Sequence, residues 1–321
     1  MIYNRLGKSG LKVSAISLGF WQNFGVNDPY DNMKAMVLTA FNEGIVHFDL
    51  ANNYGNGSIL GTAEINFGRI FKNSLEHHRD EVTITTKAGY EMWGGVYGDK
   101  NGSRKYLIAS LDQSLKRLDL DYVDIFYHHV PDSETPIEET ALALDQIVKS
   151  GKALYIGISN YNKKQTEEIL KIFKELKTPF VVNQVSYSML ERWIEEDGLV
   201  DFAKQEGFGL VAFSPLAKGL LSDKYLKGIP SDSRMGKGNP FLKSDVLTED
   251  LVKKLNKLND FALKRGQTLA QMALSWVLRD TTVASVLIGA SRSEQIKENI
   301  ATLEKPLTSD EITEIGSFLE N

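Results

Sequence analysis

Short apolar segments alternate with longer amphipathic ones along the whole 321-residue chain, and this alternation constrains the fold more than any other feature. Eight segments have the length and the β-branched or apolar composition of strands. They are residues 13–20, 44–51, 82–89, 122–129, 153–160, 181–187, 209–215 and 285–290. Between them, segments such as 29–44, 103–120, 136–151 and 269–280 repeat apolar residues every three to four positions, which predicts helices. An α/β fold with a parallel sheet follows.

Eight strand–helix units favour closure into a (β/α)8 TIM barrel, a single domain over residues 1–321. A doubly wound open sheet is the alternative. The barrel is favoured because the units run evenly to the C-terminus without a linker, and because no dinucleotide-binding fingerprint follows the first strand. The sequence GNGSILG (55–61) imitates that fingerprint, but its third glycine comes one residue late and it follows the second strand. We interpret its glycines as turn residues.

Three further segments shape the expected barrel. Residues 3–14 (YNRLGKSGLKVS) predict a β-hairpin with its turn at Gly7–Gly10, placed to plug the bottom of the barrel. Long irregular segments follow the third strand (89–102) and the seventh strand (216–241). Loops of this length usually form lids or pocket walls, so we expect the binding site beside them.

Charge and composition exclude several classes of function. The net charge is −5 and the basic residues are scattered among acidic ones, which argues against a nucleic-acid partner. The chain has no cysteine, so disulfides, thiolate zinc sites and a thiol nucleophile are excluded. The opening MIYNRLGKSG has no apolar core of a signal peptide, and no stretch of 18 consecutive apolar residues occurs. We therefore expect a cytoplasmic protein that does not enter the membrane.

Ionisable residues gather where three neighbouring strands are expected to end. Strand two ends in Asp49 and its loop carries Tyr54, strand three ends in Lys87, and strand four ends in His128 and His129. Each has an ordinary structural explanation when taken singly, such as a turn residue or a core histidine. A lysine in an apolar strand needs a partner, however, and Asp49 is the nearest carboxylate in a barrel. Because barrel enzymes place their active sites at these strand ends, the set indicates a site.

Proton donation to a carbonyl oxygen is the chemistry that suits this set. A phenol has a pKa near 10, and an ammonium within about 4 Å favours the phenolate by roughly 4 kcal/mol, or about three pKa units, before the cost of burial. We expect Asp49 to keep Lys87 protonated and a histidine to orient the substrate oxygen. Adjacent strand histidines point to opposite faces. His47 is interpreted as a strand residue and His77 with His78 as a solvated loop pair. No metal site is expected.

These residues match the pattern of the aldo-keto reductases, and the resemblance covers nearly the whole chain. Seven segments carry it in the family's order: NRLGKSGLKVSAISLGFW, FDLANNYG, TTKAG, LKRLDLDYVDIFYHHVPD, GKALYIGISNY, AFSPLAKGLLSDKY and VLIGASRSEQIKEN. The chain resembles most the branch that holds the L-glyceraldehyde 3-phosphate reductases and the potassium channel β-subunits, through FDLANNYG, GYEMWGGVYG and GIPSDSRM.

The resemblance implies an NADPH-dependent reductase of aldehydes and ketones. It assigns a catalytic tetrad of Asp49, Tyr54, Lys87 and His129, with Tyr54 as proton donor, and it selects His129 where strand parity could not choose. The branch suggests a small hydroxyaldehyde such as glyceraldehyde 3-phosphate, or methylglyoxal, as substrate. A homo-oligomer is compatible with this assignment.

The resemblance also implies contacts to the cofactor. Ser159, Asn160 and Gln184 would bind the nicotinamide carboxamide, and Phe213 would stack on the ring. Trp21 would lie where cofactor and substrate meet. The further residues implied are Asp49, Ser214, Pro215, Leu216, Gly219, Lys224, Arg234, Gly289, Gln295, Glu298 and Asn299.

A phosphate site is expected after the last strand. Ser291 followed by Glu294 has the pattern of a capping box that starts a helix, whose free N–H groups attract a phosphate. Arg292 adds a guanidinium that can clamp a phosphate, which favours NADP over NAD.

Three loop tryptophans, Trp21, Trp93 and Trp193, suggest an aromatic wall for the substrate beside Tyr54 and His129, whereas Trp276 lies in an apolar helix and is interpreted as core. Arg192 would either bind a substrate phosphate or be a rim charge. Two other functions stay open. One is a cofactor-binding regulatory subunit similar to the channel β-subunits, and the other is a Schiff-base aldolase that uses Lys87.

Overall fold

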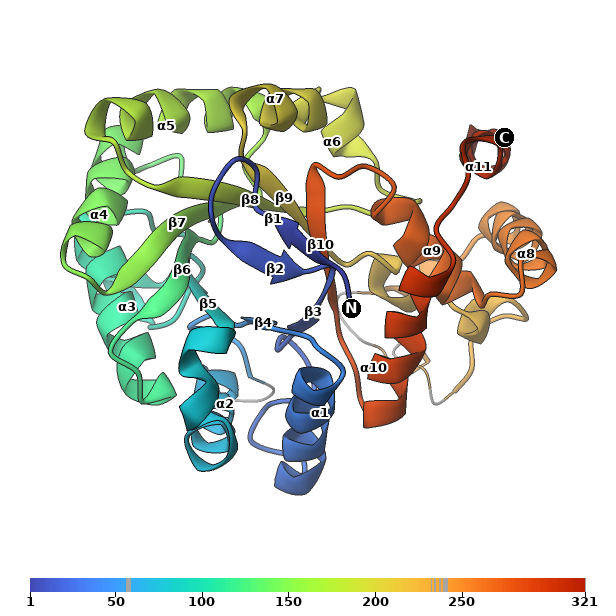
Figure 1. The fold of residues 1–321 in the computed structure, drawn as a ribbon, viewed down its shortest axis with the longest axis horizontal. Helices are drawn as coiled ribbons and strands as arrows, with labels where there is room; N and C mark the ends of the chain where they lie inside the picture. Colours follow the sequence, from blue (N-terminus) through green and yellow to red (C-terminus); the bar gives the residue numbers. More distant parts are fainter. Residues whose placement is uncertain (56–58, 232, 234, 237, 239–241, 321) are drawn as a thin grey trace.

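Eight parallel strands close into a barrel in the order β10-β3-β4-β5-β6-β7-β8-β9 (Figure 1). The computed structural model describes residues 1–55, 59–231, 233, 235–236, 238 and 242–320. The barrel strands are β3 (Ile16–Gly19), β4 (His47–Asp49), β5 (Thr83–Ala88), β6 (Val123–His128), β7 (Ala153–Ser159), β8 (Phe180–Ser186), β9 (Gly209–Phe213) and β10 (Val283–Ile288). The predicted barrel is confirmed, and the open doubly wound sheet is excluded.

Helices surround the barrel as an outer ring, with α11 at its edge (Figure 1). They are α1 (Tyr30–Asn42), α2 (Thr62–Ser74), α3 (Arg104–Leu118), α4 (Ile137–Lys149), α5 (Lys163–Leu176), α6 (Trp193–Glu196), α7 (Leu199–Glu206), α8 (Glu249–Lys264), α9 (Leu269–Val277), α10 (Ser293–Ile300) and α11 (Ser309–Glu320). Short 3-10 helices lie at η1 (Glu76–Glu81), η2 (Gly95–Tyr97), η3 (Ala217–Gly219), η4 (Asp223–Tyr225), η5 (Ser244–Val246) and η6 (Ala301–Glu304). His77 and His78 belong to η1, so their expected place in a loop was wrong.

The predicted N-terminal hairpin is present as β1 (Tyr3–Arg5) paired antiparallel with β2 (Lys12–Ser14). Its Leu6 and Val13 pack beneath the barrel against interior residues such as Ile125. The apolar run 13–20 is therefore two strands rather than one. Ala15 separates them, because the chain leaves its antiparallel partner there and Ile16 pairs with Val286 of the last strand.

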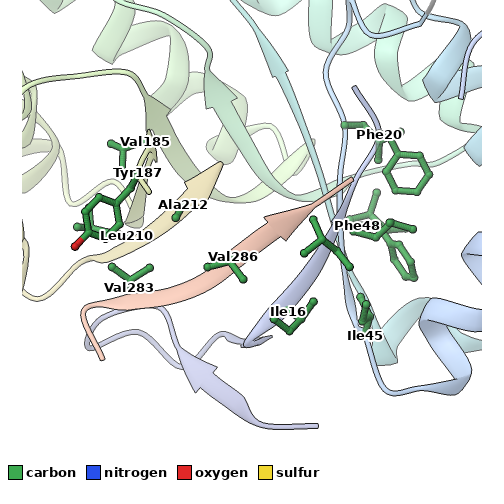
Figure 2. Packing of buried hydrophobic residues seen from close by; sticks show 14 of the residues in the cluster. Ile16, Phe20, Ile45, Phe48, Val185, Tyr187, Leu210, Ala212, Val283 and Val286 are labelled. Carbon is green, nitrogen blue, oxygen red and sulfur yellow. The ribbon is translucent and has the colours of Figure 1, made fainter. Parts of the chain in front are cut away.

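Side chains alternate between the two faces of each barrel strand. Most outward residues are apolar and pack against the helices, and Figure 2 shows part of this layer, including Ile16, Phe48, Leu210 and Val286. The inward residues on β3, β4 and β5 are polar: Ser17, His47, Asp49, Thr85 and Lys87, all buried. The barrel interior is therefore polar on the side formed by β3, β4 and β5.

Strand β10 departs from regular alternation. Its register against β9 shifts between Val283 and Ser285, as in a β-bulge. Val283 packs in the outer layer, and the extra residue lets Ser285 face the interior.

The two long segments expected after the third and seventh barrel strands are present, since the residues that the structure describes there form only short 3-10 helices. Among the described helices, none is both long and apolar enough to cross a membrane.

Candidate active site

An ion pair lies inside the barrel where β4 and β5 end. Lys87 Nζ is 2.5 Å from Asp49 Oδ2, and both side chains are buried, with 0% and 2% of their surface exposed. Lys87 also donates to the carbonyl oxygen of Leu50 at 2.6 Å. The predicted pairing of this lysine with Asp49 is confirmed.

Two neutral side chains also donate to Asp49. Thr85 Oγ1 and Gln184 Nε2 each lie 2.9 Å from Oδ1. With Lys87 on the other oxygen, the carboxylate accepts three donors, which compensate its loss of water. Thr85 was not among the predicted site residues, although strand periodicity puts it on the same face as Lys87, two residues away.

Tyr54 is held beside this ion pair by the loop that follows β4. Its hydroxyl oxygen lies 3.4 Å from Lys87 Nζ, and the same nitrogen is 4.8 Å from the ring centroid. The carbonyl oxygen of Tyr54 accepts from the N–H groups of Gly61 and Ala63, which ties the loop to the start of α2. Gly55 and Gly61 have φ of +136° and +83°, so the interpretation of these glycines as turn residues holds for the described part of 55–61.

Lys87 was expected to lower the pKa of the Tyr54 phenol, but the effect of burial is larger. Burial raises the pKa of Tyr54 well above 10, and the carboxylate of Asp49 and the phenol of Tyr90 add to this rise. Burial also lowers the pKa of Lys87, which Asp49 opposes. Because Asp49 offsets much of the charge on Lys87, the cost of desolvating a phenolate decides the direction. Tyr54 is therefore protonated at neutral pH, the state that a proton donor requires.

His129 follows β6 and lies against Tyr54. The two rings meet edge to face at 5.7 Å, and Tyr90 packs on the imidazole at 4.7 Å. Burial lowers the pKa of His129 well below 6.5, with Lys87 and His128 adding to the effect, so its imidazole is neutral. Nδ1 of His129 is buried and has no hydrogen-bond partner among the described residues.

His128 lies on the opposite face, as strand parity predicts. Its Nδ1 is 2.5 Å from the hydroxyl of Tyr161, away from Tyr54. Burial lowers its pKa to about 4. Of the two histidines, His129 alone contacts Tyr54 within the described residues.

The residues expected to hold the nicotinamide lie in or directly after β7, β8 and β9, and Gln184 among them contacts the ion pair. Ser159 pairs with Gln184 in the sheet, and Phe213 ends the next strand. Asn160 has a φ of +62°, and its Nδ2 donates to the carbonyl oxygen of His129 at 3.0 Å. Trp21 follows β3 and is 36% exposed. These positions form one rim with the predicted tetrad.

The segment after β9 begins with a tight turn. Ser214 has a φ of +53° and its carbonyl oxygen accepts from Ala217 at 2.8 Å, while Pro215 is buried and Leu216 is partly buried. Gly219 has a φ of +103°, and Lys224 is exposed in η4. Arg234, also expected to bind the cofactor, lies outside the described residues.

The start of α10 differs from the expectation. The helix begins at Ser293, so Arg292 rather than Ser291 is the N-cap, and no described side chain caps it. Gln295 is therefore at the third helical position and reaches back to accept from the N–H and Oγ–H of Ser291 at 2.8 and 3.1 Å. The predicted capping box of Ser291 and Glu294 is wrong by one residue.

The other predicted phosphate and adenosine residues surround this helix start. Arg292 is exposed and lies 3.8 Å from both Glu294 and Glu298, longer than a close ion pair. Gly289 is exposed at the end of β10, whereas Asn299 is buried on the helix.

The predicted substrate residues occupy different environments. Trp93 packs edge to face on Tyr106 at 5.0 Å, and Trp193 donates from Nε1 to the carbonyl oxygen of Ser186 at 3.0 Å. Arg192 pairs with Glu195 through Nε at 2.8 Å and a second guanidinium nitrogen at 2.6 Å. This pair favours a rim charge, and the contact of Arg192 with substrate stays a prediction. Trp276 is 2% exposed, as expected for core.

The part of the chain that the structure describes contains no group of three metal-binding side chains. The absence of a metal site stays a prediction.

The sequence matches the model of the Aldo/keto reductase family over residues 15–320. The chain is an aldo/keto reductase. It is 53% identical to the L-glyceraldehyde 3-phosphate reductase of Escherichia coli strain K12 over 306 residues, 94% of this chain and 88% of that protein. A probable voltage-gated potassium channel subunit beta of Arabidopsis thaliana is 37% identical, over 98% of this chain and 96% of that one.

Solved structures agree with this assignment. A thermostable aldo-keto reductase crystallised with the inhibitor epalrestat is 30% identical, with a TM-score of 0.78 over 99% of this chain and 100% of that chain. The resemblance expected from the seven segments is confirmed. The aldo/keto reductase is an oxidoreductase, and NAD(P)H is the typical cofactor of its family.

Proposed function

We propose that this aldo/keto reductase uses NADPH to reduce small aldehydes, such as glyceraldehyde 3-phosphate or methylglyoxal, to alcohols. One observation carries the proposal: Lys87 Nζ lies between Asp49 Oδ2 and the hydroxyl of Tyr54, at 2.5 and 3.4 Å. The 53% identity to a protein named L-glyceraldehyde 3-phosphate reductase supports the choice of substrate class.

The four side chains have separate tasks in this proposal. NADPH, when bound, supplies the hydride to the carbonyl carbon. Tyr54 gives its proton to the carbonyl oxygen as negative charge develops there, and the ammonium of Lys87 stabilises the phenolate that remains. Asp49 holds that ammonium in place. The neutral imidazole of His129, 5.7 Å from the ring of Tyr54 between centroids, orients the carbonyl oxygen.

The residues present fit this cofactor. The first turn of α10 has no side-chain cap among the described residues, so its N–H groups are available to a phosphate. Arg292 is exposed beside them and suits the 2′-phosphate of NADPH. At the other end, Ser159, Asn160 and Gln184 would hold the nicotinamide, with Phe213 beneath the ring.

The proton donor is tested with Tyr54→Phe. Carbonyl reduction should fall by about 100-fold or more, because the ring remains while the acid is lost. NADPH should still quench protein fluorescence, which shows that the variant is folded and binds cofactor. Loss of NADPH absorbance is followed with a panel of aldehydes, including glyceraldehyde 3-phosphate and methylglyoxal. Turnover retained by the variant contradicts the assignment of Tyr54.

The cofactor preference is tested with Arg292→Gln. We expect the KM for NADPH to rise about tenfold and the KM for NADH to change little, since only NADPH carries the phosphate. Lys297→Gln removes another exposed cation from the same helix and serves as the control. Equal effects on both cofactors would remove the role given to Arg292.

A regulatory subunit is the second candidate function, favoured by the 37% identity to a probable channel subunit beta. It predicts cofactor binding with only weak reductase activity. Rapid multiple turnover of any small aldehyde by the native protein would exclude it.

A further inference from the structure

A continuous line of buried polar side chains descends from Asp49 into the barrel. Thr85 Oγ1 lies 2.9 Å from Asp49 Oδ1 and 3.3 Å from His47 Nε2. Nδ1 of the same imidazole is 2.9 Å from Ser17 Oγ, which is 2.5 Å from Ser285 Oγ. Thr85, His47, Ser17 and Ser285 are each 0% exposed. We call these four residues the interior chain.

The fold explains why the interior chain is continuous. Its members come from four strands that are neighbours in the barrel, β10, β3, β4 and β5. Ser285 reaches the interior because of the register shift in β10. None of the four belongs to the predicted tetrad or to the predicted cofactor and substrate contacts.

The contact with Asp49 orients the hydrogen atoms at the upper end of the interior chain. A carboxylate only accepts, so the hydroxyl of Thr85 donates to Asp49, and its lone pairs face His47. His47 therefore carries its hydrogen on Nε2. Burial lowers the pKa of His47 to about 4, so the ring is neutral and Nδ1 accepts from Ser17. Ser285 donates its own hydrogen to the carbonyl oxygen of Ser14, so the hydrogens of Thr85, His47 and Ser17 are the ones that point towards Asp49.

The lower end of the interior chain is closed. Ser285 Oγ lies 2.7 Å from the carbonyl oxygen of Ser14, and both residues are 0% exposed. A backbone carbonyl cannot supply a proton, so these contacts orient groups rather than deliver protons from solvent.

His47 has a specific effect on Thr85. The single hydrogen of Thr85 has a second acceptor, the carbonyl oxygen of Phe48 at 3.4 Å. The N–H of His47 occupies a lone pair of Thr85 and so favours the rotamer that donates to Asp49. Without it, the hydroxyl can turn to Phe48 and Asp49 loses one of its three donors.

We propose that His47 is a positioning residue for carbonyl reduction, acting through Thr85 on the Asp49–Lys87 pair. The proposal rests on the roles given above to Asp49, Lys87 and Tyr54. The charged groups that face His47 are Asp49 on its own strand and Lys87 on β5. From β3 the contact is the hydroxyl of Ser17, which in turn lies against the hydroxyl of Ser285 on β10.

Two pairs of variants separate positioning from packing. His47→Gln can place an amide nitrogen near the position of Nε2, whereas the shorter His47→Asn reaches only the position of Nδ1 and cannot donate to Thr85. Thr85→Ser keeps the hydroxyl and Thr85→Val removes it at similar volume. We expect kcat to fall roughly 10- to 100-fold in His47→Asn and Thr85→Val, with a smaller change in KM, because a hydrogen bond to a charged group is lost. His47→Gln and Thr85→Ser should retain most of the activity.

The pH dependence gives a second readout that packing defects do not share. Loss of a donor changes the electrostatics of the Asp49–Lys87 pair, so the pH profile of kcat should shift in His47→Asn and Thr85→Val but not in their paired variants. Equal kcat and equal profiles within each pair of variants would overturn the proposal.

The native protein offers a test that does not depend on the folding of variants. Long-range nitrogen–proton NMR of 15N-histidine distinguishes the two neutral tautomers, and the proposal requires hydrogen on Nε2 of His47. Hydrogen on Nδ1 would overturn it. If Tyr54→Phe keeps its turnover, the proposed function fails. If Tyr54→Phe is inactive and the His47 variants keep the kcat and the pH profile of the native protein, only the proposal for His47 fails.

Discussion

Lys87 and Asp49 carry full charges in a place where neither reaches water. Each side chain compensates the charge of the other. Thr85 and Gln184 donate further hydrogen bonds to Asp49, and Lys87 donates to the carbonyl oxygen of Leu50. Removing one member leaves an uncompensated charge, which costs far more than an exposed pair contributes.

Lys87→Met should therefore lower the free energy of unfolding by about 3–5 kcal/mol, measured by urea denaturation. Asp49→Leu combined with Lys87→Met should recover part of this loss, because no charge is then buried alone. Lys253→Met is the matched control, since Lys253 and Asp250 are 70% and 92% exposed, and we expect a change below about 0.5 kcal/mol. Similar losses in Lys87→Met and Lys253→Met would contradict this account.

Sequence reasoning found the charged and aromatic members of the site because ionisable side chains at the ends of apolar strands are conspicuous. It missed Thr85 and Tyr90, because neither residue type is unusual in its segment. Their roles depend on their contacts with Asp49 and His129 in the folded protein. It also misjudged the direction of the pKa of Tyr54, since the balance between a nearby cation and desolvation depends on burial. The helix start at Ser293 was misplaced by one residue because Ser291 and Arg292 are both followed three positions later by a residue able to cap.

At the scale of elements, α2 approaches the end of α3 more closely at Gly68 than a residue with a side chain would allow. A Cβ atom on Gly68 of α2 would lie 2.6 Å from the carbonyl oxygen of Leu118 and 2.7 Å from that of Arg117. Both contacts are with backbone at the end of α3, which cannot move as a side chain can. The glycine thus sets the spacing of two helices beside the loop that carries Tyr54.

Gly68→Ala should destabilise the protein by about 2 kcal/mol or more, although alanine is the better helix former by about 1 kcal/mol. Gly316 in α11 provides the matched control, because nothing lies within 4 Å of its Cβ position. Gly316→Ala should stabilise by roughly 0.5–1 kcal/mol. Thermal and urea unfolding of the two variants compare the effects, and the same sign of change in both would refute the spacing argument.

Most strands and helices could be predicted because the regular spacing of their apolar residues is visible in the sequence. The exception is the run 13–20, where residues 12–14 join the hairpin and Ile16–Gly19 join the barrel. Both halves are apolar or β-branched, so local pattern cannot show that they pair with different partners. The bulge in β10 is likewise set by its neighbours rather than by its own composition.

The whole molecule keeps several imidazoles neutral in its interior. Burial lowers the pKa values of His47 and His128 from 6.5 to about 4. Between these values the unfolded chain binds protons that the folded protein does not, so stability should fall as the pH drops from about 6.5 towards 4. Each histidine accounts for about 3 kcal/mol over that whole window.

His128→Gln should weaken this pH dependence. We expect it to lose about 2 kcal/mol less stability than the native protein between pH 7.5 and pH 5, measured by urea denaturation at both values. His77→Gln, which removes an exposed imidazole, should leave the pH dependence unchanged. An unaltered dependence in His128→Gln would show that this histidine is not the buried neutral group described above.

The closure of the barrel also has a consequence for how the protein is made. β10 pairs with β3 on one side and with β9 on the other, and Asn4 of the hairpin donates to the carbonyl oxygen of Ala284 at 2.9 Å. A growing chain on the ribosome therefore holds β3 without its second neighbour until residues 283–288 emerge. Until then two strand edges are open to other chains. We therefore expect newly made chains to be prone to aggregation until the first and last barrel strands pair.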